Sequence, residues 1–319
     1  MASNPIETVL ASTLKGSKGR LIMAAAQSNA LMGWVFSKDR VKYETGGHVI
    51  TNPIILGRNP NVTSYEYYDE LPVAQTNEFD TIEYNWSRVA GTVIISDQEQ
   101  DENTGEQEIF KLMTAKVDVL EESFKEKFGS YLFGAGAGVD PNGLTNLIPD
   151  DPTTGTLGTI SRATETDWRT SAYDMDGNLN ADNIEEVFDD ILLDLTLNGE
   201  KPDIILCGRN ILRLYRAAVR DKVVINLSET NDGKKMIDLG FKGTTHQGIP
   251  MMYDEDCPDN KAYFINSKFL NLHILKGVNM KVKDLVAPWN IDAVGKRTVW
   301  QGQWCLWRAF RTHAVLINE

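Results

Sequence analysis

The chain has 319 residues, of which 42% are hydrophobic and 24% charged, and its formal net charge is −13. This composition is typical of a folded globular protein built as one large domain or as two modest ones. The acidic balance argues against a free nucleic-acid-binding protein, which needs clustered Lys and Arg to neutralise phosphates. We expect no membrane association, because no stretch approaches the roughly 18 consecutive apolar residues of a membrane span.

The first 46 residues are predicted to form an N-terminal arm. Asn4 as N-cap, Pro5 at the first helical position and Gly16 just past the end predict a short helix. A mixed apolar and basic segment follows, and Gly46 with Gly47 then breaks the chain.

A long acidic ribbon with β character is predicted from about residue 48 to residue 95. Residues 79–86 alternate, with Ile82, Tyr84 and Trp86 on one face, which is typical of a half-buried strand. Such a ribbon has no core of its own to cover. We therefore expect it to lie on something outside its own domain, which indicates assembly.

A single long helix is predicted over residues 105–133, with Thr104 as a possible cap and Gly134 at its end. At a rise of 1.5 Å per residue it forms a rod of roughly 40 Å. One narrow apolar stripe runs along it, at spacings of three and four residues. The stripe consists of Ile109, Met113, Val117, Leu120, Phe124, Phe128 and Tyr131.

The following sequence predicts an α/β unit and then a β-rich end. The unit contains a helix at 181–197, a buried strand at 203–207 and a helix at 210–220. Further strands are predicted at 248–253, 262–266, 272–275, 280–286 and 304–317. Together these elements indicate an α+β fold.

Motifs that would indicate catalysis or a cofactor are not found. Residues 134–138 are glycine-rich but follow a helix, whereas a dinucleotide loop precedes one. No GxSxG motif supports a Ser-His-Asp triad. The histidines and cysteines lack metal-ligand spacing. We assign no catalytic residue and no cofactor. The histidines and cysteines of the chain are His48, His246, His273, His313, Cys207, Cys257 and Cys305.

One segment has the spacing of a calcium-binding loop. Its candidate ligands, at loop positions 1, 3, 5, 7 and 12, are Asp174, Asp176, Asn178, Asn180 and Glu185. Leu179 occupies the sixth position, where the sharp turn of such a loop requires glycine. The favoured interpretation is a solvated turn, with Asn180 as the N-cap of the next helix.

The charges are distributed unevenly along the chain. Residues 59–108 carry 12 acidic side chains against one basic, Arg88, whereas residues 261–319 carry nine basic and three acidic ones. Both regions could be solvated surfaces. Alternatively, the acidic ribbon of one copy lies on the basic region of another, where opposite charges set the register. Candidate interface residues are Asp69, Glu70, Asp80, Glu83, Arg88, Lys281, Lys283, Lys296 and Arg297.

The order of these parts resembles a tailed-bacteriophage major capsid protein of the Hong Kong 97-type fold. The resemblance covers nearly the whole chain, and its specificity lies in the order of short motifs. These motifs are Gly46-Gly47, residues 79–86, Ile95-Ser-Asp-Gln-Glu99, Asn103-Thr-Gly105, Tyr131-Leu-Phe-Gly134, Gly143-Leu144, residues 155–162 and Trp168.

The resemblance implies a division of the chain into four parts. Residues 1–46 would be the N-terminal arm and residues 47–96 an extended β-hairpin loop. Residues 97–172 and 269–319 would form a peripheral domain, with a spine helix at 105–133 on a β-sheet. Residues 173–268 would form an inserted α/β axial domain.

The resemblance also implies a structural role rather than an enzymatic one. The chain would self-assemble into pentamers and hexamers of an icosahedral phage head, which holds double-stranded DNA without sequence-specific binding. Separate scaffolding, portal and cement proteins would be its partners. It would be located in the virion capsid and assembled in the host cytoplasm. Only about 45 residues precede the ribbon, so any scaffold would be a separate protein.

Two alternatives remain at this stage. An encapsulin-type nanocompartment shell protein has the same fold and encloses an enzyme cargo. A soluble α+β hydrolase, or a Ca²⁺-dependent enzyme that uses the loop from Asp174 to Glu185, belongs to a different class. Some capsid proteins of this type crosslink their subunits through a lysine of the extended loop. No lysine occurs between Lys42 and Lys111 here, so we do not expect that chemistry.

Overall fold

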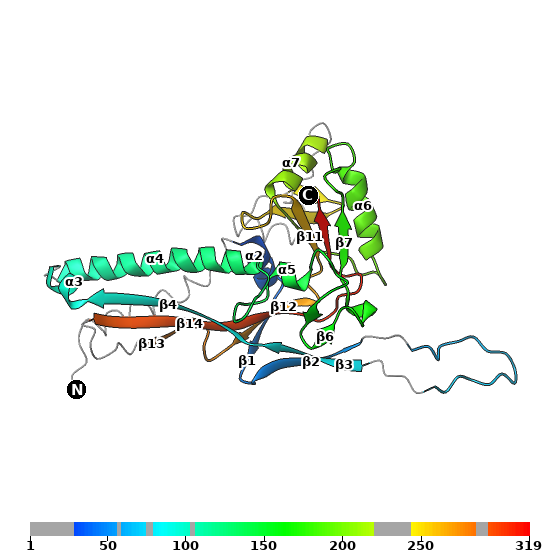
Figure 1. Ribbon diagram of the computed structural model, residues 1–319, viewed down its shortest axis with the longest axis horizontal. Helices are drawn as coiled ribbons and strands as arrows, with labels where there is room; N and C mark the ends of the chain where they lie inside the picture. The colour runs from blue at the N-terminus through cyan, green and yellow to red at the C-terminus, as the bar shows by residue number, and fades with distance from the viewer. Residues whose placement is uncertain (1–28, 56–58, 75–78, 103–105, 220–243, 285–292) are drawn as a thin grey trace.

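The computed structural model describes residues 29–55, 59–74, 79–102, 106–219, 244–284 and 293–319. A long helix lies above an elongated sheet, a second sheet with its own helices adjoins one end, and a hairpin projects from the base (Figure 1). The short helix expected near residues 4–16 lies outside the described residues. None of the described helices has the length and apolar character needed to cross a membrane.

The first sheet is built around one long strand, β14 (Ala293–Leu306). On one edge β14 pairs with β4 (Ser87–Ser96), in antiparallel register from Ala293↔Ser96 to Gly302↔Ser87. Its other edge pairs with β13 (Lys281–Asp284) and β12 (Leu270–Leu275). Strand β1 (Val41–Glu44) adds to β12 in parallel. The part of the N-terminal arm next to the ribbon is therefore a strand of this sheet.

The spine helix α4 (Glu106–Leu132) confirms the predicted helix at 105–133. Of its apolar stripe, Val117, Leu120, Phe124 and Phe128 are buried and Tyr131 is partly buried. The rings of Phe128 and Trp300 of β14 meet edge to face, with centroids 5.0 Å apart. Gly91 of β4 permits this close approach. A Cβ added there would lie 2.5 Å from Leu120 Cδ1 and 2.6 Å from Phe124 Cε2. The side chains of Ile109 and Met113 lie outside the described set.

The ribbon is a hairpin of β2 (Val49–Ile55) and β3 (Phe79–Asn85). The predicted alternation is confirmed, since Ile82 and Tyr84 are buried while their neighbours in β3 are exposed. The expectation that the ribbon has no core of its own to cover is wrong for its base. There the Tyr84 hydroxyl donates to the Leu306 carbonyl at 2.8 Å.

A small hairpin packs against the same buried face of β3. It consists of β5 (Thr156–Leu157) and β6 (Ile160–Ser161), whose apolar residues are buried. The contact is so close that a Cβ on Gly158 would lie 2.4 Å from Ile82 Cγ1. The base of the ribbon therefore shares the core of its own subunit.

A buried glutamine fixes the corner between β3 and β4. Gln303 Nε2 donates to the Asn85 carbonyl at 2.9 Å and to Ser87 Oγ at 3.2 Å, and its Oε1 accepts from the Asn142 amide at 2.7 Å. Residues 87–96, which the sequence placed in the extended loop, thus continue directly into the spine-helix sheet as β4. We therefore place the end of the loop at about residue 86.

The second sheet has the order β7-β15-β11-β8-β10-β9. Its strands are β7 (Ser171–Asp174), β8 (Ile204–Cys207), β9 (Thr244–His246), β10 (Ile249–Tyr253), β11 (Lys261–Ile265) and β15 (Ala314–Ile317). Helices α6 (Ile184–Leu195) and α7 (Arg209–Ala218) confirm the predicted α/β unit and cover one face. The other face joins the core of the first sheet. Strand β15 belongs here, although the sequence placed it in the peripheral domain.

Helix α2 (Ala30–Ser37) lies in the arm, where the sequence predicted no helix. Asn29 caps it, accepting from the Met32 amide at 3.1 Å, and Asp254 Oδ2 accepts from the Ala30 amide at 3.2 Å. The helix is almost wholly buried, so its apolar residues surround it and show no stripe of period 3.6.

The buried stripe of α4 generates the first prediction. Phe124→Asp places a carboxylate among apolar side chains and removes a buried ring, so we expect a loss of about 3–5 kcal/mol in the free energy of unfolding. Urea denaturation of the dispersed subunit measures it. Ser123→Asp, on the exposed side of the same turn, is the matched control. A folded Phe124→Asp subunit of unchanged stability would contradict the packing described.

Acid destabilisation of the fold should involve His313. Burial lowers the pKa of His313 to about 3, against about 6.5 for a free imidazole. Between these values the unfolded chain binds a proton that the folded chain excludes, so stability falls as the pH falls, by roughly 1.4 kcal/mol per unit. We expect the unfolding free energy of a His313→Gln variant to fall less between pH 7 and pH 4.5 than that of the wild type. Equal falls would exclude this role.

Candidate subunit interface

The far end of the hairpin exposes a large set of apolar side chains. Tyr67 is 95% exposed and Tyr68 103% exposed, and they lie in the described loop at 59–74. Further exposed members are Val62, Tyr65, Leu71, Val73, Ile55 and Phe79. Aromatic and aliphatic side chains gathered on a projecting loop mark an interaction surface.

The turn at this tip is held by polar contacts of its own. Asp69 Oδ2 accepts from the Glu66 amide at 2.7 Å, and Asn61 Nδ2 donates to the Ala74 carbonyl at 2.7 Å. These bonds tie the two sides of the loop together while the tyrosines remain uncovered. The apolar surface is therefore presented by a defined turn.

The four acidic candidates are exposed but do not form one patch. Asp69 and Glu70 lie at the tip, and Asp80 and Glu83 lie in β3. In the register of the hairpin Asp80 pairs with Ile54 and Glu83 with Thr51, so the two carboxylates point to opposite faces. The sequence alone indicates this, because two strand residues that are an odd number of positions apart point to opposite faces.

The basic candidates separate by face in the same way. Arg297 lies opposite Lys283 and Thr92, and Lys281 lies two residues from Lys283 on the same face. Arg88 joins this face, where its Nε donates to Gln301 Oε1 at 2.9 Å. We call Arg88, Lys281, Lys283 and Arg297 the basic sheet face, which lies on the side of the sheet away from α4.

Lys296 does not belong to the basic sheet face. It pairs with Val93, which faces α4, and it is only 6% exposed. As a candidate for an intersubunit contact it is therefore wrong. Neighbouring residues of a strand point to opposite faces, so Lys296 and Arg297 cannot both lie on one surface.

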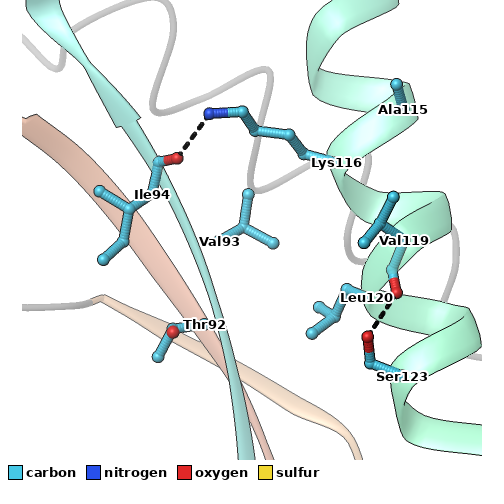
Figure 2. A pocket seen from close by; sticks show the side chains of 8 residues that line it. All are labelled: Thr92, Val93, Ile94, Ala115, Lys116, Val119, Leu120 and Ser123. Atoms are coloured by element: carbon cyan, nitrogen blue, oxygen red, sulfur yellow. Dashed lines mark hydrogen bonds between the residues drawn. The ribbon is translucent and has the colours of Figure 1, made fainter.

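A groove of about 360 Å³ lies between β4 and α4 (Figure 2). Ile94 is 48% exposed and Val119 is 67% exposed, and both line it. Lys116 closes it on one side, since its Nζ donates to the Ile94 carbonyl at 3.0 Å and pairs with Glu99 at 2.7 Å. The bond from Lys116 lowers the pKa of Glu99. The remaining lining residues are Thr92, Val93, Ala115, Leu120 and Ser123.

The groove is lined mainly by apolar side chains rather than by groups that could act in catalysis. Among the described residues that line it, Lys116 is the single ionisable one, and its ammonium is paired with Glu99. Strand β4 pairs with β14 on one edge, and within the described part of the chain no strand pairs with its other edge. The surface is therefore suited to apolar or extended polypeptide chain, and it lacks an acid–base pair for chemistry.

The calcium candidates lie on a tight turn and the start of α6. The Asn178 amide donates to the Met175 carbonyl at 2.8 Å, with Asp176 and Gly177 at φ of 45° and 73°. Leu179, in the sixth position of the calcium pattern, is buried in the core beneath α6. Among the described residues no group of three His, Cys, Asp or Glu is placed to hold a metal ion.

Asn180 is not the N-cap of α6. Its Oδ1 accepts from the amides of Asp182 and Asn183, at 2.9 and 3.2 Å, in a turn that precedes the helix. Helix α6 begins at Ile184, so its N-cap is Asn183. The side chain of Asn180 therefore stabilises the turn that leads into α6, and the helix itself begins about three residues later than expected.

The buried histidines are engaged in structural contacts. His246 Nδ1 lies 3.0 Å from the Tyr215 hydroxyl, and its Nε2 lies 2.8 Å from Asp189 Oδ1. This cluster joins α6, α7 and β9, and burial raises the pKa of Tyr215 to about 12. His313 contacts Thr312 Oγ1 at 2.6 Å, and His273 contacts Glu44 at 3.1 Å.

The three cysteines are buried, whereas the remaining histidine is exposed. Cys207, Cys257 and Cys305 are buried and free, and burial raises the pKa of each thiol. High-pKa thiols are poor nucleophiles and poor metal ligands. His48 is exposed at the start of the hairpin. These geometries give no paired nucleophile and base open to solvent among the described residues.

Comparison with known proteins gives matches by structure. No protein-family model matches the sequence, and no curated protein does so. The capsid asymmetric unit of cyanophage A-1(L) matches with a TM-score of 0.65 and 15% identity, covering 88% of this chain and 91% of that chain. The capsid of Myoviridae phage XM1 matches with a TM-score of 0.53 and 11% identity, covering 90% and 92%.

An encapsulin is also similar. The holo-SrpI encapsulin complex from Synechococcus elongatus matches with a TM-score of 0.52 and 11% identity, covering 89% of this chain and 86% of that chain. At these identities the likeness is one of fold. Each match covers most of both chains, so the likeness extends over nearly the whole fold. The chain has the Hong Kong 97-type capsid fold.

Proposed function

We propose that this chain is a major capsid protein that self-assembles into pentamers and hexamers of an icosahedral phage head enclosing double-stranded DNA. The observation that carries the proposal is the hairpin tip, whose tyrosines are exposed on a projecting turn of a chain with a capsid fold. An isolated subunit leaves this apolar surface in water. Contact with another copy buries it and supplies the main driving force for association.

The distribution of charge indicates which surface of the neighbour the hairpin contacts. The hairpin carries exposed carboxylates, including Asp69, Glu70, Asp80 and Glu83, whereas the basic sheet face carries Arg88, Lys281, Lys283 and Arg297. Asp80 and Glu83 point to opposite faces of β3, so whichever face of the hairpin lies on the basic sheet face of a neighbour brings one of these carboxylates to the basic side chains. Such pairing speeds encounter and fixes register more than it adds affinity.

The role is structural rather than enzymatic, and its site is the virion capsid. The net charge of −13 suits a container in which packed DNA slides instead of binding tightly. In this proposal the subunits assemble in the host cytoplasm with separate scaffolding, portal and cement proteins. The contact between hairpin and neighbour is noncovalent, because no lysine occurs between Lys42 and Lys111.

An encapsulin-type shell is the second candidate, since the SrpI encapsulin has a similar fold. The two candidates differ in content rather than in subunit structure. A phage head protects DNA from nuclease, whereas an encapsulin retains a cargo enzyme. The content of purified particles therefore distinguishes them.

Electron microscopy of the expressed chain tests the proposed function. We expect closed shells with pentameric and hexameric units, and we expect particles from phage-producing cells to contain nuclease-resistant DNA. Shells that copurify with an enzyme instead would favour the encapsulin. A chain that stays monomeric in sedimentation and binds Ca²⁺ would exclude both shells and support a soluble Ca²⁺-dependent enzyme.

Charge reversal on the hairpin tests its contact. The variant Asp80→Lys with Glu83→Lys changes two exposed side chains, so the subunit should keep its stability within about 0.5 kcal/mol. Particle yield should fall at least about tenfold, because loss of about 1.4 kcal/mol at one interface weakens association tenfold. Glu165→Lys with Glu255→Lys, also exposed, is the matched control. Unchanged yield in the hairpin variant would contradict the pairing.

A further inference from the structure

Helix α6 carries an acidic stripe on its outer face. Glu186 and Asp190 are exposed and one helical turn apart, and Leu193, which is 72% exposed, follows on the same side. The helix contains five acidic residues and no basic one. We call Glu186, Asp190 and Leu193 the acidic stripe.

The other acidic side chains of α6 are engaged within the subunit. Asp189 contacts His246 at 2.8 Å, and Asp194 contacts Arg311 at 3.3 Å. Glu186 and Asp190 form no hydrogen bond or ion pair with any described residue. Their charges therefore remain available for a contact outside the subunit.

Helix α7 carries the complementary stripe. Arg209, Arg213 and Arg216 are exposed, and they recur at i, i+4 and i+7, the same spacing as the acidic stripe. The helix contains no acidic residue. At 1.5 Å per residue both stripes are about 10 Å long. We call these three residues the arginine stripe.

The two stripes do not satisfy each other within one subunit. Helices α6 and α7 meet through buried side chains, where Phe188 stacks on Tyr215 with ring centroids 5.6 Å apart. No ion pair joins the exposed faces in the described part of the chain. Figure 1 shows the two helices along different margins of the α/β part, where they form its outer layer.

We infer that the arginine stripe of one copy lies against the acidic stripe of the next copy, and that repetition of this contact closes a ring. The inference rests on the proposed function and adds to it the surfaces that meet within a capsomer. Each copy carries both halves of a head-to-tail contact, and head-to-tail contacts close into rings when the rotation permits. Leu193 would lie on the aliphatic part of an arginine.

A nucleic acid is the other class of partner that an arginine stripe suggests. Three arginines on a chain of net charge −13 provide little phosphate neutralisation. A bound nucleic acid would also leave the acidic stripe without a partner. A second copy accounts for both stripes together, and we therefore favour it.

A charge-swap experiment tests the inference. Glu186→Lys with Asp190→Lys should lower the yield of capsomers and particles at least about tenfold, and Arg213→Glu with Arg216→Glu should do the same. The chain with all four substitutions should recover most of the wild-type yield, because the swapped charges attract again. Sedimentation velocity and electron microscopy measure association, and circular dichroism checks that each subunit is folded.

Controls separate this contact from the rest of the assembly. The variant Glu165→Lys with Glu255→Lys reverses two exposed charges outside both stripes and should assemble normally. Wild-type shells together with normal assembly of both two-site variants would overturn the stripe contact and leave the proposed function intact. Failure of the fourfold variant to recover would also overturn it. A monomeric wild type would overturn both.

The nucleic-acid alternative has its own outcome. If the arginine variant assembles normally but encloses less DNA than the wild type, the arginine stripe binds the packaged nucleic acid, and the intersubunit contact is wrong. If the wild type associates into stable dimers instead of rings, the contact is two-fold and the ring is wrong.

Discussion

The close contact of α4 with β4 at Gly91 is the constraint on which the rest of the structure depends. Any side chain at this position would collide with Leu120 and Phe124, so the glycine allows the apolar stripe of the helix to lie directly on the sheet. The sheet extends from β4 through β14 to β13 and β12. At its other end β4 turns into β3, at the corner that Gln303 fixes. The direction in which the hairpin projects thus follows from the packing of the helix.

Much of this arrangement could be predicted from local periodicity. The three- and four-residue spacing through Leu120, Phe124 and Phe128 predicted α4, and the alternation through Ile82 and Tyr84 predicted β3. Both patterns are visible because each element has one buried side and one exposed side. Helix α2 lacks that contrast, since burial of nearly its whole surface removes any stripe. The sequence for this reason predicted no helix there.

The parts of the fold that depend on pairing between distant segments could not be predicted from the sequence. The second sheet takes β15 from the end of the chain and pairs it in parallel with β7, about 140 residues away. No local pattern in 314–317 distinguishes that position from one in the first sheet. The prediction of charged interface candidates was limited for a different reason. They were chosen from the net charge of a segment, and net charge does not say to which face of a strand each side chain points. Side chains alternate between the two faces of a strand, so Lys296 and Arg297 point to opposite faces, as do Asp80 and Glu83. This alternation could have been applied to the sequence as soon as the strands were predicted.

The buried core of the described chain is formed by side chains of one subunit. Two clusters of buried side chains fill the space around the sheets, and the base of the hairpin shares one of them. Among the described residues, the uncovered surfaces include the hairpin tip, the groove beside Val119, the basic sheet face and the stripes on α6 and α7. These surfaces have different chemistry: the tip and groove are apolar, whereas the sheet face and stripes are charged. Apolar burial supplies affinity, and charge supplies register and partner choice. Because the buried clusters lie within one subunit, we expect substitutions on these surfaces to act on assembly and substitutions beneath α4 to act on folding.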